Sequence, residues 1–265
     1  MDSTTAIYLY AAVKSTRRPS TARVPPGVPG ATSPEVVPLA KGLWLVTGDV
    51  PLDVYGPSRL EPRLQDLEWV ADVAVAHEGV VEHFSRVRGT TVVPMKLFTM
   101  FSSLEKAVAD VASQRAALDR VIRHIAGCEE WGVRVTAAPG VPVPSAGGRT
   151  PRAAAKPTSG AAFLAARRDA RDAMKAARAE ALAVADSAYT RLGRLARDSR
   201  QRERLQEAGT NPPILEAAFL VTAAGRARFK TEAKRQAAAC AAAGADMTLT
   251  GPWPAYNFVA GVERG

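Results

Sequence analysis

Short apolar runs separated by polar, proline-rich segments dominate the first half of the chain. Ile7–Val13 and Leu43–Val50 are continuous apolar or aromatic runs of the length typical of buried strands. Between them, residues 15–34 are rich in proline, arginine, serine and glycine, which predicts a loop. The apolar segment Thr91–Phe101 predicts a further extended region. Its Pro94 favours a sheet edge or a bulge, because proline cannot donate a ladder hydrogen bond.

Apolar residues spaced three or four positions apart predict helices between these strands. The sequence also predicts the ends of the helix Leu104–Ile125. Ser102 or Ser103 can cap its N-terminus, and Gly127 can end it. An earlier helix, over 60–86, is expected to bury one apolar face made of Leu60, Leu64, Leu67, Ala71, Ala74, Val80 and Val81.

The second half of the chain begins at residues 138–160, which are rich in Pro, Gly, Ser and Ala. This composition predicts a linker. A long Ala- and Arg-rich helix is predicted over Ala161–Leu205. Its three- and four-residue steps define a seam of mostly small residues that lets another element approach closely. The seam consists of Phe163, Ala166, Ala170, Met174, Ala177, Ala181, Val184, Ala188, Leu192 and Leu195.

The order of strands and helices predicts an α+β protein with two domains, each packing helices on an antiparallel or mixed sheet. We place the domains at 1–127 and 128–265. The strand Glu130–Thr136 either closes the first domain or opens the second. The remaining predicted elements are the strand Ile214–Val221, the helix Arg226–Ala243 and the strand Met247–Gly251.

Charge and cysteine content narrow the class of protein. The 265 residues carry a net charge of +9, and the surplus is concentrated between residues 149 and 207, where Lys and Arg outnumber Asp and Glu about twofold. The two cysteines, Cys128 and Cys240, have no metal-ligand spacing, which favours a reducing cytoplasm. The N-terminus lacks the pattern of a signal peptide, and no apolar run reaches the ~20 residues of a membrane span.

No arrangement of residues predicts an enzyme, a metal site or a cofactor site. His77 and Glu78 with His83 resemble a metalloprotease motif, but that motif needs histidines four residues apart, and these are six apart. We therefore expect a histidine–glutamate pair on a helix surface. His124 near Cys128 has no carboxylate to orient it, so it is interpreted as a helix-end histidine favoured by the helix dipole. Glycine-rich phosphate loops and nucleophile elbows are absent from the sequence.

The arginine-rich helix leaves a nucleic-acid-binding function as the alternative. Against it, the stretch RRDARDAMKAARAE alternates basic and acidic residues, which is typical of a solvated, salt-bridged face. The aromatic RNA-binding motif of small α+β modules is also missing. Nucleic acid is therefore the less favoured partner.

Two apolar stretches are better candidates for contact with a protein partner. The segment TVVPMKLFTMF exceeds what one strand needs to face one core. Either both of its faces are buried, which is the default interpretation, or one face meets a partner, since methionine-rich surfaces suit adaptable binding. The stretch GPWPAYNF follows the last strand and contains two prolines and three aromatic rings. These rings either pack on the core or between the domains, or they contact a partner. In the packing interpretation, Trp253→Ala costs a few kcal/mol. The candidate residues are Met95, Leu97, Phe98, Met100, Phe101, Trp253, Tyr256 and Phe258.

Several stretches together resemble the F/L family of gas vesicle accessory proteins. They are IYLYAAV, DLEWVADVAVAHEGVVEHF, TVVPMKLFTMFSS, EEWGVRV and LTGPWPAYNFV, in the family's order and spacing over nearly the whole chain. The sequence departs from the family at Ala11, where glycine is common, at Ala255, where a second proline is common, and at Asn257, where a small residue is common.

The resemblance implies two α+β domains, the second a modified ferredoxin-like fold. It also implies a cytoplasmic, non-enzymatic protein associated with gas vesicles, which contacts the small, hydrophobic main shell protein and other accessory proteins. Such a protein would keep the shell subunit soluble or deliver it at nucleation. This role needs adaptable apolar surface and no catalytic chemistry.

Overall fold

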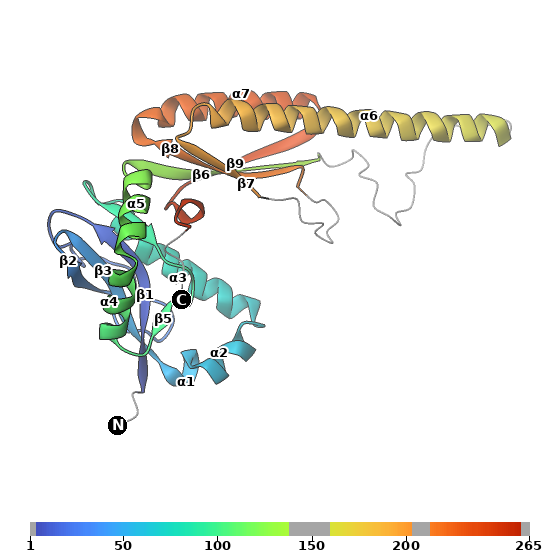
Figure 1. Cartoon of the computed structure of the whole chain (residues 1–265). Coiled ribbons are helices and arrows are strands. Elements are labelled where there is room, and N and C mark those ends of the chain that lie inside the picture. Colours follow the sequence, from blue (N-terminus) through green and yellow to red (C-terminus); the bar gives the residue numbers. More distant parts are fainter. Residues whose placement is uncertain (1–3, 138–159, 203–212, 261–265) are drawn as a thin grey trace. The chain divides into compact units, whose positions relative to one another are not determined.

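The computed structural model describes residues 4–137, 160–202 and 213–260. The chain forms two compact units, shown in Figure 1: the described residues of Met1–Glu130 with Pro252–Gly265, and those of Trp131–Gly251. The chain passes from the first unit to the second within β6 (Cys128–Ala137) and returns within β9 (Ala245–Trp253). All but the last residue of the predicted linker 138–160 lies outside the described residues.

The sheet of the first unit has the strand order β2-β3-β1-β4, and β5 also pairs with β1. The pairings of β1 with β3, β4 and β5 and of β2 with β3 are antiparallel. Most residues of β1 are buried, which explains why its sequence is a continuous apolar run. The strands are β1 (Thr5–Lys14), β2 (Glu35–Ala40), β3 (Leu43–Pro51), β4 (Thr91–Pro94) and β5 (Met100–Phe101).

The predicted strands Ile7–Val13 and Leu43–Val50 are confirmed as β1 and β3, whereas β2 was not predicted. The sequence of β2 contains Pro38, and its pairing with β3 is irregular between Pro38 and Ala40. Proline at an irregular edge strand weakens the alternating pattern that marks a strand in sequence.

The segment Thr91–Phe101 is not one extended strand. It divides into β4 and β5, joined by a turn in which Phe98 has a φ of +62°. Pro94 is the last residue of β4, which is the last strand in the order β2-β3-β1-β4. The sequence predicted such an edge position for this proline.

The predicted helix over 60–86 is two helices, α2 (Pro57–Arg63) and α3 (Leu67–Ser85). Asp66 ends the interruption, because its carboxylate accepts hydrogen bonds from the backbone N–H groups of Glu68 and Trp69 and so caps α3. The predicted apolar face was therefore wrong in its first half: Leu64 and Leu67 are exposed. The buried face consists of Val73, His77, Val80, Val81 and Phe84.

The predicted helix Leu104–Ile125 is also divided, into α4 (Leu104–Ser113) and α5 (Arg115–Ile125). Its predicted ends are confirmed. The Ser103 hydroxyl accepts from the backbone of Lys106, and Gly127, with a φ of +66°, follows the end of α5. A short helix, α1 (Leu52–Tyr55), follows β3.

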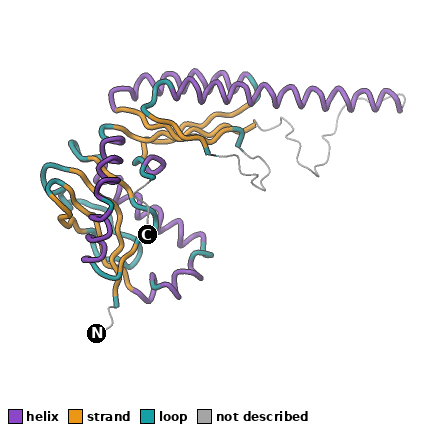
Figure 2. The backbone as a smooth tube through the Cα atoms, viewed as in Figure 1, coloured by secondary structure: helices purple, strands orange, loops and turns teal. Residues whose placement is uncertain are grey.

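The second unit has the element order β6-α6-β7-β8-α7-β9 and the strand order β7-β8-β6-β9. Figure 2 shows α6 and α7 on the same face of this sheet. The strands near Ile214 and Met247 and the helix near Arg226 are confirmed. Besides β6 and β9, this unit consists of α6 (Gly160–Gly193), β7 (Asp198–Gln201), β8 (Leu215–Thr222) and α7 (Arg226–Ala242).

The long helix is shorter than predicted, and only part of its seam is packed. It ends at Gly193 rather than Leu205, because residues 198–201 form β7, a polar strand without apolar alternation that pairs with β8. Figure 1 shows the first half of α6 extending beyond the sheet. Ala166 and Ala170 are accordingly exposed, whereas the buried seam residues are Ala181, Ala188 and Leu192, joined by Ala185.

Candidate functional site

The candidate partner-binding residues occupy very different environments. Met95 and Phe258 are buried, so they support the fold and offer no surface. Leu97 and Trp253 have exposed fractions of 38% and 43%. The others, Phe98, Met100, Phe101 and Tyr256, are half-buried.

Leu97 and Phe98 lie in the turn between β4 and β5, beside the first turn of α3. The Phe98 ring stacks on that of Trp69, with centroids 5.8 Å apart and planes inclined by 20°. The guanidinium of Arg63 lies 5.4 Å from the Trp69 ring centre. We call these four residues, Arg63, Trp69, Leu97 and Phe98, the Trp69 patch. Asp66 positions Trp69, because it caps the helix turn from which Trp69 projects.

Buried polar groups under the turn form hydrogen bonds that fix the backbone of Phe98. The Tyr8 hydroxyl oxygen accepts a hydrogen bond from the backbone N–H of Phe98 at 3.2 Å and lies 3.0 Å from Nδ1 of His77. Since the Phe98 N–H can only donate, the hydroxyl proton is free to point at His77 Nδ1. The turn is thereby connected through Tyr8 on β1 to His77 on α3.

His77 is 2% exposed, so the predicted helix-surface pair with Glu78 is wrong. The apolar spacing of α3 placed this residue on the core side. Burial lowers the pKa of His77 to about 4, and burial raises the pKa of Tyr8 above its usual range. Both groups are therefore neutral at pH 7, and the Tyr8–His77 contact is a structural hydrogen bond between uncharged groups.

The segment after β9 is anchored in the first unit. Its short 3₁₀ helix, η2 (Tyr256–Phe258), places the Tyr256 ring 6.3 Å from that of His77 and the Phe258 ring 6.5 Å from that of His124. Phe258 is 2% exposed. Tyr256 and Phe258 therefore confirm the interpretation of this segment as packed on a core, whereas Trp253 is too exposed for that role.

Sequence reasoning missed two important residues, Trp69 and Glu130. Trp69 had a usable signal, since a tryptophan three residues after a capping aspartate lies in the first turn of a helix. Glu130 had no such signal in the sequence, because its position only indicated a strand. In the structure it is 5% exposed and accepts a hydrogen bond from Asn257, which is distant in sequence. Such a long-range pair leaves no local pattern.

Within the described ranges, no group of three or more His, Cys, Asp or Glu residues could hold a metal ion. Among the described residues, Cys128 and Cys240 form no disulfide. His124 lies in the last turn of α5, as the sequence predicted. Over the same part of the chain, none of the helices is both long and apolar enough to cross a membrane.

The fold belongs to a class already seen among gas vesicle proteins. The crystal structure of gas vesicle protein GvpF from Anabaena sp. PCC7120 matches with a TM-score of 0.64 at 14% identity, covering 96% of each chain. GvpF from Microcystis aeruginosa matches with a TM-score of 0.61 at 11% identity, covering 96% of this chain and 98% of that one. At such identities the likeness concerns the fold alone.

The sequence comparisons give the family. The model described as gas vesicle synthesis protein GvpL/GvpF matches residues 6–260. Gas vesicle protein L from Streptomyces sp. (strain CB03234) is 31% identical over 97% of this chain and 94% of its own. The chain therefore belongs to the GvpL/GvpF family of gas vesicle synthesis proteins, and the resemblance found in its sequence is confirmed.

Proposed function

We propose that this protein is a non-enzymatic accessory factor of gas vesicle assembly that binds the hydrophobic main shell subunit. It keeps that subunit soluble or delivers it at nucleation, in the cytoplasm, and it contacts other accessory proteins as well. Membership of the GvpL/GvpF family supports the gas vesicle role. The Trp69 patch supports the apolar partner.

The observation that carries the proposal is the apolar turn in which Leu97 is exposed and Phe98 is half-buried. A turn between two strands normally carries small or polar residues. This one places a leucine in solvent and holds the neighbouring Phe98 with a φ of +62°. A bulky side chain in the left-handed region costs on the order of 1–3 kcal/mol, and such strain concentrates at functional sites.

The surroundings of Phe98 maintain this strained conformation. The Tyr8 hydroxyl accepts its backbone N–H, and the Trp69 ring stacks on its side chain. Met100 packs against the same core, and its flexible thioether suits an adaptable surface. The patch is therefore a preorganised apolar surface, which reduces the entropy cost of binding a partner.

For the second unit we propose a modified ferredoxin-like fold. Its element order, strand-helix-strand-strand-helix-strand, and its strand order β7-β8-β6-β9 support this assignment. We keep 1–127 and 128–265 as the proposed domains. The compact units differ from them in that the anchored segment after Gly251 packs with the first unit.

Co-purification tests the proposed function. The tagged protein is expressed with the main shell subunit of the same organism, in moderate salt with nuclease added, as wild type and as Leu97→Asp. The matched control is Val75→Asp, which changes an apolar residue of α3 that is 73% exposed and lies outside the Trp69 patch.

We expect the wild type and Val75→Asp to retain a soluble complex and Leu97→Asp to lose most of it. If the shell subunit stays in the pellet with wild-type protein, the proposed function is wrong. If both variants lose the complex equally, the Trp69 patch is not the binding surface. Nucleic acid eluting in place of the shell subunit would favour the alternative, which neither the family nor the fold supports.

A further inference from the structure

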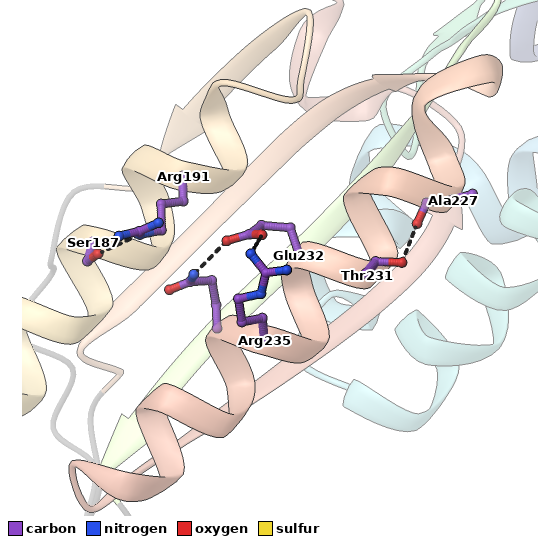
Figure 3. Close-up of polar contacts among 7 residues, drawn as sticks. Ser187, Arg191, Ala227, Thr231, Glu232 and Arg235 are labelled. Carbon is purple, nitrogen blue, oxygen red and sulfur yellow. Dashed lines mark hydrogen bonds and ion pairs between the residues drawn. The ribbon is translucent and has the colours of Figure 1, made fainter.

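A basic groove lies between α6 and α7 in the second unit, far along the sequence from the Trp69 patch. It has a volume of about 650 Å³. Figure 3 shows its polar contacts, with Ser187 and Arg191 on one helix and Ala227, Thr231, Glu232 and Arg235 on the other. Its charged lining consists of Arg191, Arg194, Arg228, Arg235 and Glu232.

The single carboxylate in this lining is already engaged. Oε2 of Glu232 lies 3.1 Å from the guanidinium of Arg235, and Oε1 accepts a hydrogen bond from the side chain of Gln236 at 2.7 Å. The Glu232 side chain is only 15% exposed. Glu232 therefore compensates Arg235, and both of its carboxylate oxygens are already in contact with side chains of α7.

Within the part of the chain that the structure describes, three guanidinium groups of the groove have no compensating carboxylate. Arg191 donates its Nε to the Ser187 hydroxyl at 3.3 Å, which leaves its two terminal nitrogens for another acceptor. Arg194 and Arg228 make no ion pair with any residue that the structure describes. Like charges gathered in one groove repel one another, and a negatively charged group in the groove would relieve this repulsion.

We propose that this groove binds an acidic, amphipathic segment of a partner protein. Guanidinium forks match carboxylates geometrically and form paired, charge-assisted hydrogen bonds. Leu195 and Ala227 also line the groove, so an apolar side chain between two carboxylates has a surface to contact.

One feature favours a carboxylate-bearing segment over nucleic acid. The described lining contains no aromatic ring on which a base could stack. The inference does not rest on the proposed contact with the shell subunit, because the two surfaces share no residue and belong to different units.

Fluorescence anisotropy with the full-length protein tests this inference. The probe is a fluorescein-labelled helical peptide of about 20 residues, roughly 30 Å long, with glutamates four positions apart beside a leucine stripe. The second probe is a single-stranded DNA of about 20 nucleotides, and inorganic phosphate serves as a competitor. The groove variant is Arg194→Glu/Arg228→Glu, and a milder form is Arg194→Gln/Arg228→Gln. The matched control is Arg167→Glu/Arg171→Glu, because these arginines are exposed on the first half of α6 and give the same net charge.

We expect the peptide to bind the wild type and the control with similar affinity and the groove variant at least about tenfold more weakly, as two charge-assisted contacts are lost. The glutamine form should show an intermediate loss. An equal loss in the groove variant and the control would show that net charge alone is responsible and would overturn the proposal. So would tighter binding of the DNA than of the peptide, or full displacement of the peptide by millimolar phosphate.

Discussion

Asn257 binds the carboxylate of Glu130, a residue 127 positions earlier in the chain, through two hydrogen bonds. Its backbone N–H donates to Oε2 at 2.9 Å, and its side-chain amide donates to Oε1 at 2.5 Å. Since Glu130 is 5% exposed, water cannot easily replace these donors. The pair therefore fixes η2 against the first unit and sets the position of Tyr256 and Phe258.

The first prediction follows from the asymmetry of this pair. Glu130→Ala removes the acceptor of both hydrogen bonds and should lower the free energy of unfolding by about 2–3 kcal/mol. Asn257→Ala removes only the side-chain donor, because its backbone N–H remains, and should cost about 1 kcal/mol. Urea unfolding of the two variants and of the double variant measures this. Costs that simply add in the double variant would show that the two residues are not coupled.

The aromatic residues of the same segment give the second prediction. Phe258→Ala truncates a ring that is 2% exposed and should destabilise by about 3–5 kcal/mol, as for other buried aromatic residues. Trp253→Ala should cost less than about 1.5 kcal/mol, because the 43% exposed ring buries much less area. This ranking replaces the expectation from sequence that Trp253 is the anchor. Thermal unfolding distinguishes the two, and a larger shift for Trp253→Ala would contradict the assignment.

The pH dependence of stability gives the third prediction, centred on His77. Its pKa is lowered from 6.5 to about 4 in the folded state, chiefly by burial. Above pH ~6.5 the ring is neutral in both states, so it adds no pH dependence. As the pH falls from about 6.5 to 4, His77 becomes protonated in the unfolded chain but stays neutral in the folded chain. The free energy of unfolding therefore decreases. At 1.36 kcal/mol per pKa unit, the full loss is on the order of 3 kcal/mol.

His77→Gln isolates this contribution, because an amide keeps an acceptor for the Tyr8 hydroxyl but does not titrate. Glu78 acts in the opposite direction, since burial raises its pKa and its stability contribution is lost as the pH rises. Glu78 is present in both proteins, so its effect cancels in the difference. Urea unfolding between pH 8 and pH 4 should show the wild type losing stability more steeply. Parallel pH profiles would mean that His77 is protonated normally in the folded protein.

Local patterns predicted the strands of both units well and the limits of the helices less well. β1, β3 and β8 are mostly buried, so their sequences are apolar runs that can be recognised in isolation. β2 and β7 are edge strands with proline or polar residues, and their strand conformation comes from pairing with a neighbour. The interruptions at Asp66 and Gln114 were missed because the apolar spacing continues across them.

The candidate surface was predicted only in part, because sequence shows which residues are apolar but not which of them stay exposed. Within Thr91–Phe101, β4 ends at Pro94, and the following turn places Met95 inside and Leu97 outside. The stack of Phe98 on Trp69 joins segments that are not adjacent in sequence. The Tyr8–His77 contact joins residues 69 positions apart. Contacts of this kind are set by the tertiary structure.

The small-residue seam of α6 gives the last prediction, because the structure divides it into a packed half and an exposed half. Ala185 is fully buried against the core of the second unit, so Ala185→Leu forces three extra carbon atoms into a filled space and should cost about 1–3 kcal/mol. Ala170 is exposed, and leucine is nearly as good a helix former as alanine, so Ala170→Leu should change stability by less than about 0.5 kcal/mol. Circular dichroism during urea unfolding compares the two variants. Equal destabilisation would mean that the first half of α6 is packed as tightly as the second, and that the overhang seen in Figure 1 is covered in solution.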